Sequence, residues 1–206
     1  MWWDELAALP GAIAAAAAGA DGPAVHPSAR VHPDALLDES DGPIMIGAGT
    51  IVCRGASIRG PAMIGANCLV GDQAMLRGPV SLGDGTRIGF ATELKNAIVE
   101  EDVAIGPMCF VADSKVEREA YLGAMVRTSN HRLDRETVKV MVDGAIMDSG
   151  REKLGCLIGA SASLGIQVII LPGRIVAAGS LFAPRITIEK NLPAGRYRHA
   201  QRLEAF

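Results

Sequence analysis

Aliphatic side chains recur at every sixth position through the middle of the chain. The longest uninterrupted run of this repeat comprises Ile46, Val52, Ile58, Ile64, Val70, Leu76, Leu82, Ile88 and Leu94. A sustained period of six fits neither a strand nor a helix alone and is typical of the stacked coils of a solenoid. Four residues after most of these aliphatics stands a small or β-branched residue, such as Ala56 or Ala62. Because a narrow coil needs inward aliphatics on its faces and compact residues near its corners, the pattern predicts a parallel β-helix.

The same repeat sets the expected limits of the coils. It slips by one residue at Val99, slips again near Val116, and resumes after a gap at Ile158, Leu164, Ile170, Val176, Phe182 and Ile188. We therefore expect a β-helix over residues 23–193. Residues 1–22 are predicted to form a short helical lead that is interrupted at Pro10 and Gly11. Residues 194–206 are predicted to form a basic tail, with Arg196, Arg198, His199 and Arg202.

The repeat vanishes over residues 127–156, where polar and charged residues replace it. Long insertions in solenoids are usually loops extruded from one face, and such loops tend to be functional. Inside this segment Val138, Val140 and Val142 alternate with other residues, and Asp143-Gly144 follows as a turn signal. The segment is therefore predicted to be an extruded loop that contains a short β-hairpin.

Composition agrees with a narrow aliphatic core, because the 206-residue chain has 24 glycines and only 4% aromatic residues. The net charge of −3 and the absence of any Lys/Arg run indicate no basic surface of the kind that binds nucleic acid. The four cysteines form no CxxC pair, which favours reduced structural thiols and a cytoplasmic location. The Ala-rich run at residues 9–20 lacks a basic segment before it, so we expect neither a signal peptide nor a membrane partner.

The hexapeptide pattern resembles that of the left-handed β-helix acyltransferases, which mostly use acetyl- or acyl-CoA, and left-handed coiling is expected from this resemblance. A narrower resemblance is to the C-terminal domain of bifunctional sugar-1-phosphate nucleotidylyltransferase/N-acetyltransferases. It rests on runs that occur in the same order, at residues 74–79, 92–96, 110–114, 122–130, 138–140, 149–155 and 170–173. The family's N-terminal nucleotidylyltransferase domain has no counterpart in this sequence, so nucleotidyl transfer by this chain alone is not expected.

This resemblance implies a CoA-dependent acetyl- or acyltransferase that acts on a phosphorylated or nucleotide-linked amino sugar. Arg77 and Lys95 match family residues that contact the phosphate side of the sugar, and Lys139 matches a lysine of the family's loop. A forked guanidinium and a mobile ammonium are a suitable pair for phosphate. The alternative is that Arg77 and Lys95 are outward side chains on a solvated coil face.

The family's acetyl-transfer base does not carry over to this chain. It is a histidine in an H-x-x-Y run, where this sequence has Pro107 and Phe110, and proline cannot accept a proton. Asn130 does match a family asparagine. His131 beside it is predicted to serve as the replacement general base, because an imidazole titrates near neutral pH. The alternative is that His131 is an exposed loop residue without a catalytic role.

For the acyl-CoA, the resemblance implies a groove between subunits along the late coils. Ala178 matches a family position that binds through its backbone amide, and Lys190, Arg196 and Arg198 are predicted phosphate partners by charge and location. The alternative for these basic residues is a solvated tail. A homotrimer is expected, because flat walls of β-helices commonly pack about a closed symmetry axis.

Two other functional classes stay open. One is a catalytically degenerate subunit that kept Arg77 and Lys95, lost chemistry at Pro107, and binds sugar phosphates or oligomerises within a nucleotidylyltransferase-type assembly. The other is the carbonic anhydrase branch of the same fold, which needs three histidines to hold zinc. Of the four histidines only His131 lies in the regular coils or loop, so no metal site is expected, and acyl transfer requires none.

Overall fold

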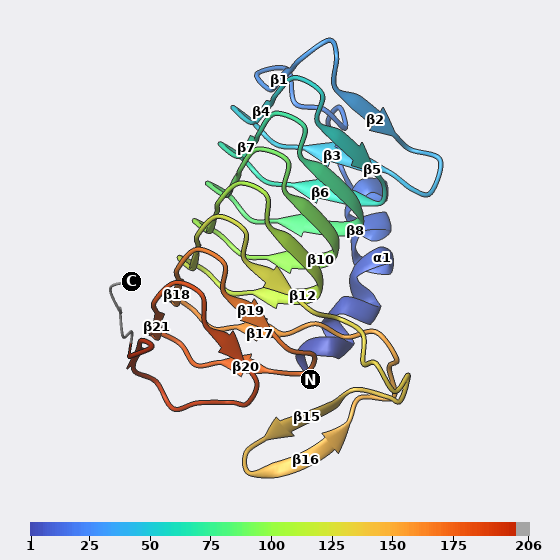
Figure 1. The fold of residues 1–206 in the computed structure, drawn as a ribbon. Helices are drawn as coiled ribbons and strands as arrows, with labels where there is room; N and C mark the ends of the chain where they lie inside the picture. The colour runs from blue at the N-terminus through green and yellow to red at the C-terminus, as the bar shows by residue number, and fades with distance from the viewer. Residues whose placement is uncertain (201–206) are drawn as a thin grey trace, which may run out of the picture.

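The computed structural model describes residues 1–200, and residues 201–206, which include Arg202 of the predicted tail, lie outside the described residues. The described part of the chain begins with a helix, α1 (Trp2–Ala18), and continues as short strands. Figure 1 shows these strands on coils that stack rung upon rung, with α1 lying along one side of the stack. No helix within residues 1–200 is long and apolar enough to cross a membrane.

Strands on successive coils pair in parallel. One face is a nine-stranded sheet in the order β1 (Arg30–Val31), β4 (Ile51–Val52), β7 (Leu69–Val70), β9 (Arg87–Ile88), β11 (Ala104–Ile105), β13 (Tyr121–Leu122), β18 (Ser163–Leu164), β21 (Leu181–Phe182) and β23 (Arg196–Tyr197). The predicted parallel β-helix with a short N-terminal helix and an extruded loop is therefore confirmed.

The remaining wall is a twelve-stranded sheet that covers two faces. Its main path is β2 (Leu36–Asp38), β5 (Ser57–Arg59), β8 (Met75–Leu82), β10 (Glu93–Val99), β12 (Phe110–Val116), β14 (Arg127–Thr128), β19 (Ile169–Ile170) and β22 (Thr187–Ile188). The other members pair beside this path and are β3 (Ile44–Ile46), β6 (Ala62–Ile64), β17 (Leu157–Ile158) and β20 (Ile175–Val176).

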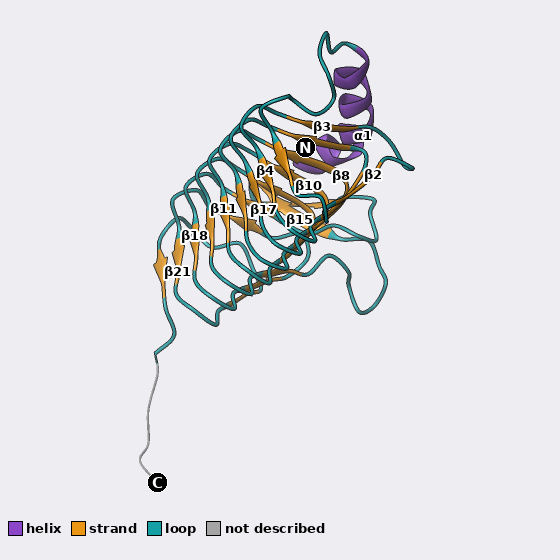
Figure 2. Cartoon of the chain, turned by 90° about the horizontal axis from the view of Figure 1, so that it is seen from above, coloured by secondary structure: helices purple, strands orange, loops and turns teal. Residues whose placement is uncertain are grey.

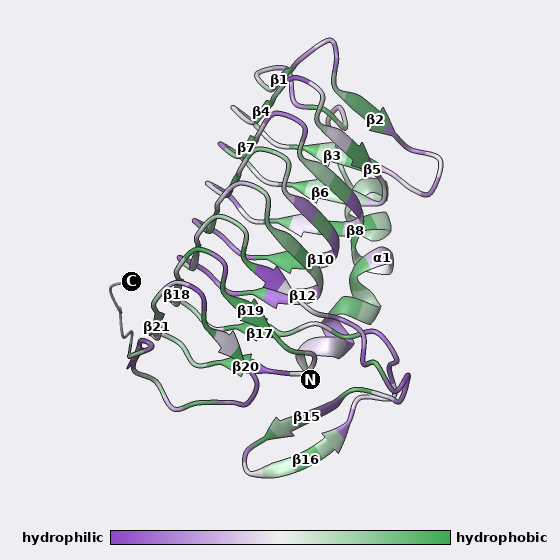
Figure 3. Cartoon of the chain, viewed as in Figure 1, coloured by the Kyte–Doolittle hydropathy of each residue, from purple (hydrophilic) through white to green (hydrophobic). Residues whose placement is uncertain are grey.

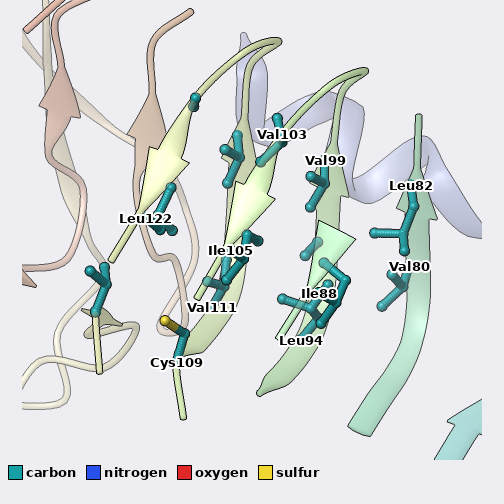
Figure 4. Packing of buried hydrophobic residues seen from close by; sticks show 14 of the residues in the cluster. Val80, Leu82, Ile88, Leu94, Val99, Val103, Ile105, Cys109, Val111 and Leu122 are labelled. Atoms are coloured by element: carbon teal, nitrogen blue, oxygen red, sulfur yellow. The ribbon is translucent and has the colours of Figure 1, made fainter. Parts of the chain in front are cut away.

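The core is the column of aliphatic side chains that the six-residue repeat predicts. Ile58, Leu76 and Leu94 are fully buried, and Figure 4 shows Leu82, Ile88, Leu94 and their neighbours stacked inside the coils. Buried polar residues at the corners form hydrogen bonds with the neighbouring coil. The hydroxyl of Thr92, for example, donates to the Gly106 carbonyl at 2.7 Å, which allows a buried polar side chain without an energetic penalty.

Strands β8, β10 and β12 are longer than the others because each continues around one corner of the coil. The first half of β8 pairs with β5 and its second half with β6. At this corner Arg59, Arg77 and Lys95 occupy equivalent positions on successive coils. Neighbouring strands are about 4.8 Å apart, so the corner carries a closely spaced ladder of basic side chains.

Helix α1 runs through Pro10 without a break, so the predicted interruption of the helical lead was wrong. Both Pro10 and Gly11 are exposed, whereas Trp2, Trp3, Leu6, Leu9 and Ile13 are buried. Burial of this face against the coils outweighs the poor helix propensity of proline and glycine, which is how tertiary packing commonly overrides a local preference. Figure 2 shows the helix beside the coil stack when the molecule is turned by 90°.

The extruded loop contains the predicted hairpin, formed by β15 (Lys139–Val142) and β16 (Ala145–Asp148) around the Asp143-Gly144 turn. In Figure 3 the hairpin is mostly hydrophobic, and the segment that joins it to the coils is hydrophilic. Val138 and Val140 belong to a second hydrophobic cluster with Trp2, Trp3 and Leu6 of α1. The hairpin and the start of the helix therefore pack against each other beside the coils.

The coil extends slightly beyond the predicted start of the tail. Strand β23 pairs with β21, and the ring of Tyr197 stacks on that of Phe182 with ring centroids 4.8 Å apart. The six-residue count ends earlier because this last rung is held by an aromatic pair in place of an inward aliphatic.

Candidate functional site

A pocket of about 410 Å³ opens where the extruded loop leaves the basic corner of the coils. It is lined by Arg77, Lys95, Phe110, Asn130, His131 and Lys153. The structure thus brings four residues singled out in the sequence, Arg77, Lys95, Asn130 and His131, around one cavity. Sequence reasoning missed Lys153, although it lies within residues 149–155, one of the runs on which the family resemblance rests.

A buried carboxylate organises this pocket. The side chain of Asp113 accepts hydrogen bonds from Nζ of Lys95 at 3.0 Å, from Nδ2 of Asn96 at 2.8 Å and from Nδ2 of Asn130 at 2.5 Å. Hydrogen bonds to a charged acceptor are stronger than those between neutral groups. Asp113 therefore fixes β10 and the start of the extruded loop to one point on β12. It too was missed as a site residue, although it lies in the run at residues 110–114.

The guanidinium of Arg77 is paired with a neighbour but keeps donors free. Its Nε donates to Oε1 of Glu93 at 2.9 Å, and its Nη2 contacts the same oxygen. An arginine has five N–H donors, so this half-exposed group can still bind an anion in the pocket. Arg59, one coil away, pairs with Asp38 and Asp41 and does not line the pocket.

His131 lies on the wall between two pockets. Its backbone forms an isolated antiparallel bridge with that of Lys153, which closes the base of the loop. The second pocket, of about 530 Å³, is lined by Ser129, His131, Arg132, Leu133, Asp134, Lys139, Leu171, Pro172 and Arg174. Lys139 therefore lies in the second pocket and not beside Arg77 and Lys95, because the hairpin carries it toward the later coils.

The four residues predicted to bind acyl-CoA all lie on the last coils of the β-helix. Ala178 is exposed in the turn after β20, Lys190 is exposed in the turn after β22, and Arg196 lies on β23. Arg198 lines a further pocket of about 510 Å³ with Ile166, Ala183, Pro184, Arg185 and His199. Arg196 pairs beside Leu181, close to the turn that carries Ala178, whereas Lys190 lies after β22 in the other sheet.

Pro107 occupies a corner turn on the opposite edge of the face that carries β12. Its carbonyl accepts from the backbone N–H of Met125 at 2.9 Å, and the backbone N–H of Met108 donates to the Phe90 carbonyl. Exposed apolar side chains gather along this corner, with Phe90 49%, Met108 40% and Ile166 48% exposed. Within residues 1–200 no group of three or more His, Cys, Asp or Glu side chains is placed to hold a metal ion.

Comparison with known proteins places the chain among acetyltransferases, although no family model matches it. It is 54% identical over 168 residues to the uncharacterized acetyltransferase YaiX of Escherichia coli O6:K15:H31, an alignment that covers 82% of this chain and 73% of YaiX. It is 33% identical over 111 residues to a bifunctional sugar-1-phosphate nucleotidylyltransferase/acetyltransferase of Sulfurisphaera tokodaii, covering 54% of this chain and 28% of that protein.

Among solved structures, a UDP-N-acetylglucosamine acyltransferase from Campylobacter jejuni aligns with a TM-score of 0.44 at 14% identity, covering 82% of this chain and 68% of that one. The hexapeptide coils, the extruded loop and the similarity to named acetyltransferases together define the class of protein. The chain belongs to the same acetyltransferase family as YaiX of Escherichia coli, and its hexapeptide repeats form a parallel β-helix. The family predicted from the repeat is confirmed.

Proposed function

We propose that the protein is a CoA-dependent acetyl- or acyltransferase whose acceptor is a phosphorylated or nucleotide-linked amino sugar. The observation that carries this proposal is the pocket at the base of the loop, where Arg77, Lys95 and Lys153 supply positive charge beside the imidazole of His131. A relative that combines sugar-1-phosphate nucleotidylyltransferase and acetyltransferase in its name supports the same substrate class.

In this proposal Arg77 and Lys95 bind the acceptor phosphate, and Asp113 holds Lys95 and Asn130 in place around it. The acceptor nitrogen or oxygen attacks the thioester carbonyl carbon of acyl-CoA, and a new amide or ester bond forms. His131 takes the proton from the acceptor as general base. The C–S bond then breaks, and the proton passes to the departing CoA thiolate, so no covalent enzyme intermediate is needed.

The acyl-CoA is proposed to lie along the late coils and to contact Ala178, Lys190, Arg196 and Arg198. Lys190 follows β22, which lies in a different sheet from β23 with Arg196, so a site that joins all four residues is proposed to use surfaces from more than one subunit. A homotrimer is proposed to provide them. The exposed apolar corner at Phe90, Met108 and Ile166 supports an interface of this kind, because exposed apolar patches commonly mark sites of protein association.

The decisive experiment is an assay of thiol release from acetyl-CoA with glucosamine 1-phosphate and with UDP-linked amino sugars as acceptors. Arg77→Met is expected to raise the acceptor KM roughly tenfold or more, since hydrogen bonds to charged groups are worth about 1.5–3 kcal/mol. Arg59→Met is the matched control, because it removes the same kind of side chain one coil outside the pocket. The control should leave KM unchanged.

His131→Gln tests the general base and should lower kcat about 100-fold without a comparable change in acceptor KM. An unchanged kcat would remove His131 from the mechanism. If no acceptor of this class releases thiol from acetyl-CoA with the wild-type protein, the proposed enzymatic function fails.

The second candidate is a catalytically degenerate subunit that binds sugar phosphates. Pro107 favours it, because proline stands where the family's proton acceptor is expected. This candidate predicts that isothermal titration calorimetry detects binding of glucosamine 1-phosphate to the wild-type protein, that Arg77→Met weakens it, and that no thiol is released. Acceptor-dependent thiol release would exclude this candidate.

A further inference from the structure

The residues that line the second pocket include more cationic than anionic side chains. Its cationic side chains are Arg132, Lys139 and Arg174, and Asp134 supplies the carboxylate among its lining residues. Asp134 is already engaged by Arg132, whose Nε lies 2.8 Å from Oδ1. That hydrogen bond lowers the pKa of Asp134 to about 2. Asp134 therefore stays ionised, and its carboxylate is already hydrogen-bonded to Arg132.

Arg174 has a buried donor without a partner. Its Nε is shielded from solvent and makes no hydrogen bond with any atom of residues 1–200. Burial, followed by repulsion from Arg132, lowers the pKa of the Arg174 guanidinium. A buried polar donor without a hydrogen bond costs free energy, and a cationic one costs more. Arg174 also lines the pocket, so an anion bound there would offset part of this cost.

The fold holds Arg174 rigidly at this point. Its backbone carbonyl accepts from the N–H of Leu157 at 3.0 Å, directly before β20. The residue before it, Gly173, has a φ of +73°, and a Cβ there would lie 2.6 Å from the Lys139 carbonyl oxygen. The close approach of β15 to the coil builds one wall of the pocket and brings Lys139 to it.

Lys139 is only partly neutralised. It lies opposite Asp148 in the hairpin, and Asp148 also accepts hydrogen bonds from the Thr137 hydroxyl and the Gly150 backbone N–H. Opposite charges on paired strands attract each other weakly when they are exposed. Lys139 can therefore contribute to binding an anion beside Arg174.

We propose that this pocket is a second anion site, which binds a phosphoryl group through the Arg174 guanidinium with support from Lys139 and His131. A guanidinium offers forked donors that match phosphate oxygens. Because His131 lines both pockets, a phosphoryl group here lies across the imidazole from the one at Arg77. The group belongs either to a nucleotide-linked acceptor or to CoA. The anion site is inferred from charge and burial alone, so it does not depend on acyl transfer.

The test is calorimetric titration of the full-length protein with inorganic pyrophosphate at constant ionic strength. Arg174→Met should weaken binding roughly tenfold or more, and Arg174→Lys should weaken it less. Arg87→Met is the matched control, because Arg87 is exposed on β9 and does not line this pocket. The control should bind pyrophosphate as the wild type does.

A second measurement separates a binding role from a structural one. Without ligand, Arg174→Met should unfold at the same temperature as the wild type or higher, because the variant no longer buries an unpartnered charge. A lower unfolding temperature for Arg174→Met in the absence of ligand would overturn the proposal. Pyrophosphate affinity of Arg174→Met within twofold of the wild type, or no binding by the wild type, would also overturn it.

Parallel titrations with CoA and with UDP identify the source of the phosphoryl group. Loss of UDP affinity in Arg174→Met, with CoA affinity intact, assigns the site to a nucleotide-linked acceptor. The opposite result assigns it to CoA. If Arg174→Met changes neither affinity, the assignment to a phosphoryl group is overturned. None of these titrations requires catalysis, so their failure is distinct from failure of the proposed acyltransferase function.

Discussion

Nζ of Lys95 lies 3.0 Å from Oδ2 of Asp113, a carboxylate that is only 4% exposed. Nδ2 of Asn130 lies 2.5 Å from the same oxygen. A single buried charge therefore positions a basic side chain of the coil and an asparagine near the start of the loop. The shape of the candidate acceptor pocket depends on this charge.

Asp113→Asn should destabilise the protein by about 2–4 kcal/mol, because it leaves Lys95 half-buried without its counter-ion. The free energy of unfolding in urea measures this loss. Asp102→Asn is a matched control: Asp102 also has a positive φ, 56° against 49° for Asp113, but it is exposed. The control should change stability by less than about 0.5 kcal/mol. Equal losses in both variants would contradict the role given to Asp113.

Gly173→Ala should displace the hairpin from the coil, because the added Cβ would lie 2.6 Å from the Lys139 carbonyl oxygen. We expect a loss of about 3 kcal/mol or more in the free energy of unfolding, from the clash and the positive φ together. In Gly179→Ala the φ is similar, +66°, but no heavy atom lies within 4 Å of the added Cβ. That control should cost about 1 kcal/mol. If both variants lose the same stability, the close approach at Gly173 does not hold the hairpin.

The coils were accessible from the sequence because they follow the repeat, whereas Arg77 and Lys95 were singled out by the family resemblance. Inward aliphatics must recur every six residues, and Arg59, Arg77 and Lys95 follow the same count from coil to coil. Asp113 was less accessible, because a one-residue slip shifts its coil relative to the one below. The continuous helix through Pro10 was also not accessible, since its stability comes from contacts with residues distant in the sequence.

The second pocket illustrates a different limit of sequence reasoning. Nε of Arg174 is buried without a hydrogen bond at the corner where the hairpin folds back against the coil. Nothing in the residues around Arg174 indicates this, since the contact joins Lys139 in the hairpin to Gly173 in a later coil. Residues such as Ala178 and Arg198, which are predicted to act across subunits, depend on surfaces that a single chain does not contain.

Lys115 links helix α1 to the coil wall and gives a prediction on pH. Its Nζ lies 2.7 Å from Oε2 of Glu5 and 3.2 Å from Oε1 of Glu100. Burial opposes its charge, but the hydrogen bonds with Glu5 and Glu100 prevail and raise the pKa of Lys115 above 10.5. Because the pKa is raised in the folded state, this stabilisation is complete below pH 10.5 and is lost as the pH rises through the folded-state pKa.

Lys115→Met should therefore lower the free energy of unfolding by about 1 kcal/mol near neutral pH and reduce the loss of stability at alkaline pH. Urea unfolding followed by the fluorescence of Trp2 and Trp3 measures both effects, since these residues lie on the docked face of α1. Lys190→Met removes an exposed lysine and serves as the control. An alkaline transition that is the same in Lys115→Met and the wild type would contradict this assignment.

The four cysteines should differ sharply in reactivity. Burial raises the pKa of Cys156 to about 12, and it raises those of Cys53, Cys68 and Cys109 as well. Only the thiolate is an effective nucleophile, and Cys53 is the one cysteine that is not fully buried. Iodoacetamide at about pH 8 should therefore modify Cys53 first, and Cys156 should react only after unfolding.

Peptide mapping by mass spectrometry after timed alkylation checks this order. Cys53→Ser is the matched variant and should leave the folded protein nearly unmodified over the period in which the wild type gains one adduct. Adding urea should then expose Cys156, whose thiol lies 3.8 Å from the Ser114 hydroxyl inside the coil. Modification of Cys156 in the folded protein at the rate of Cys53 would mean that the coil opens at β12 and β17 under native conditions.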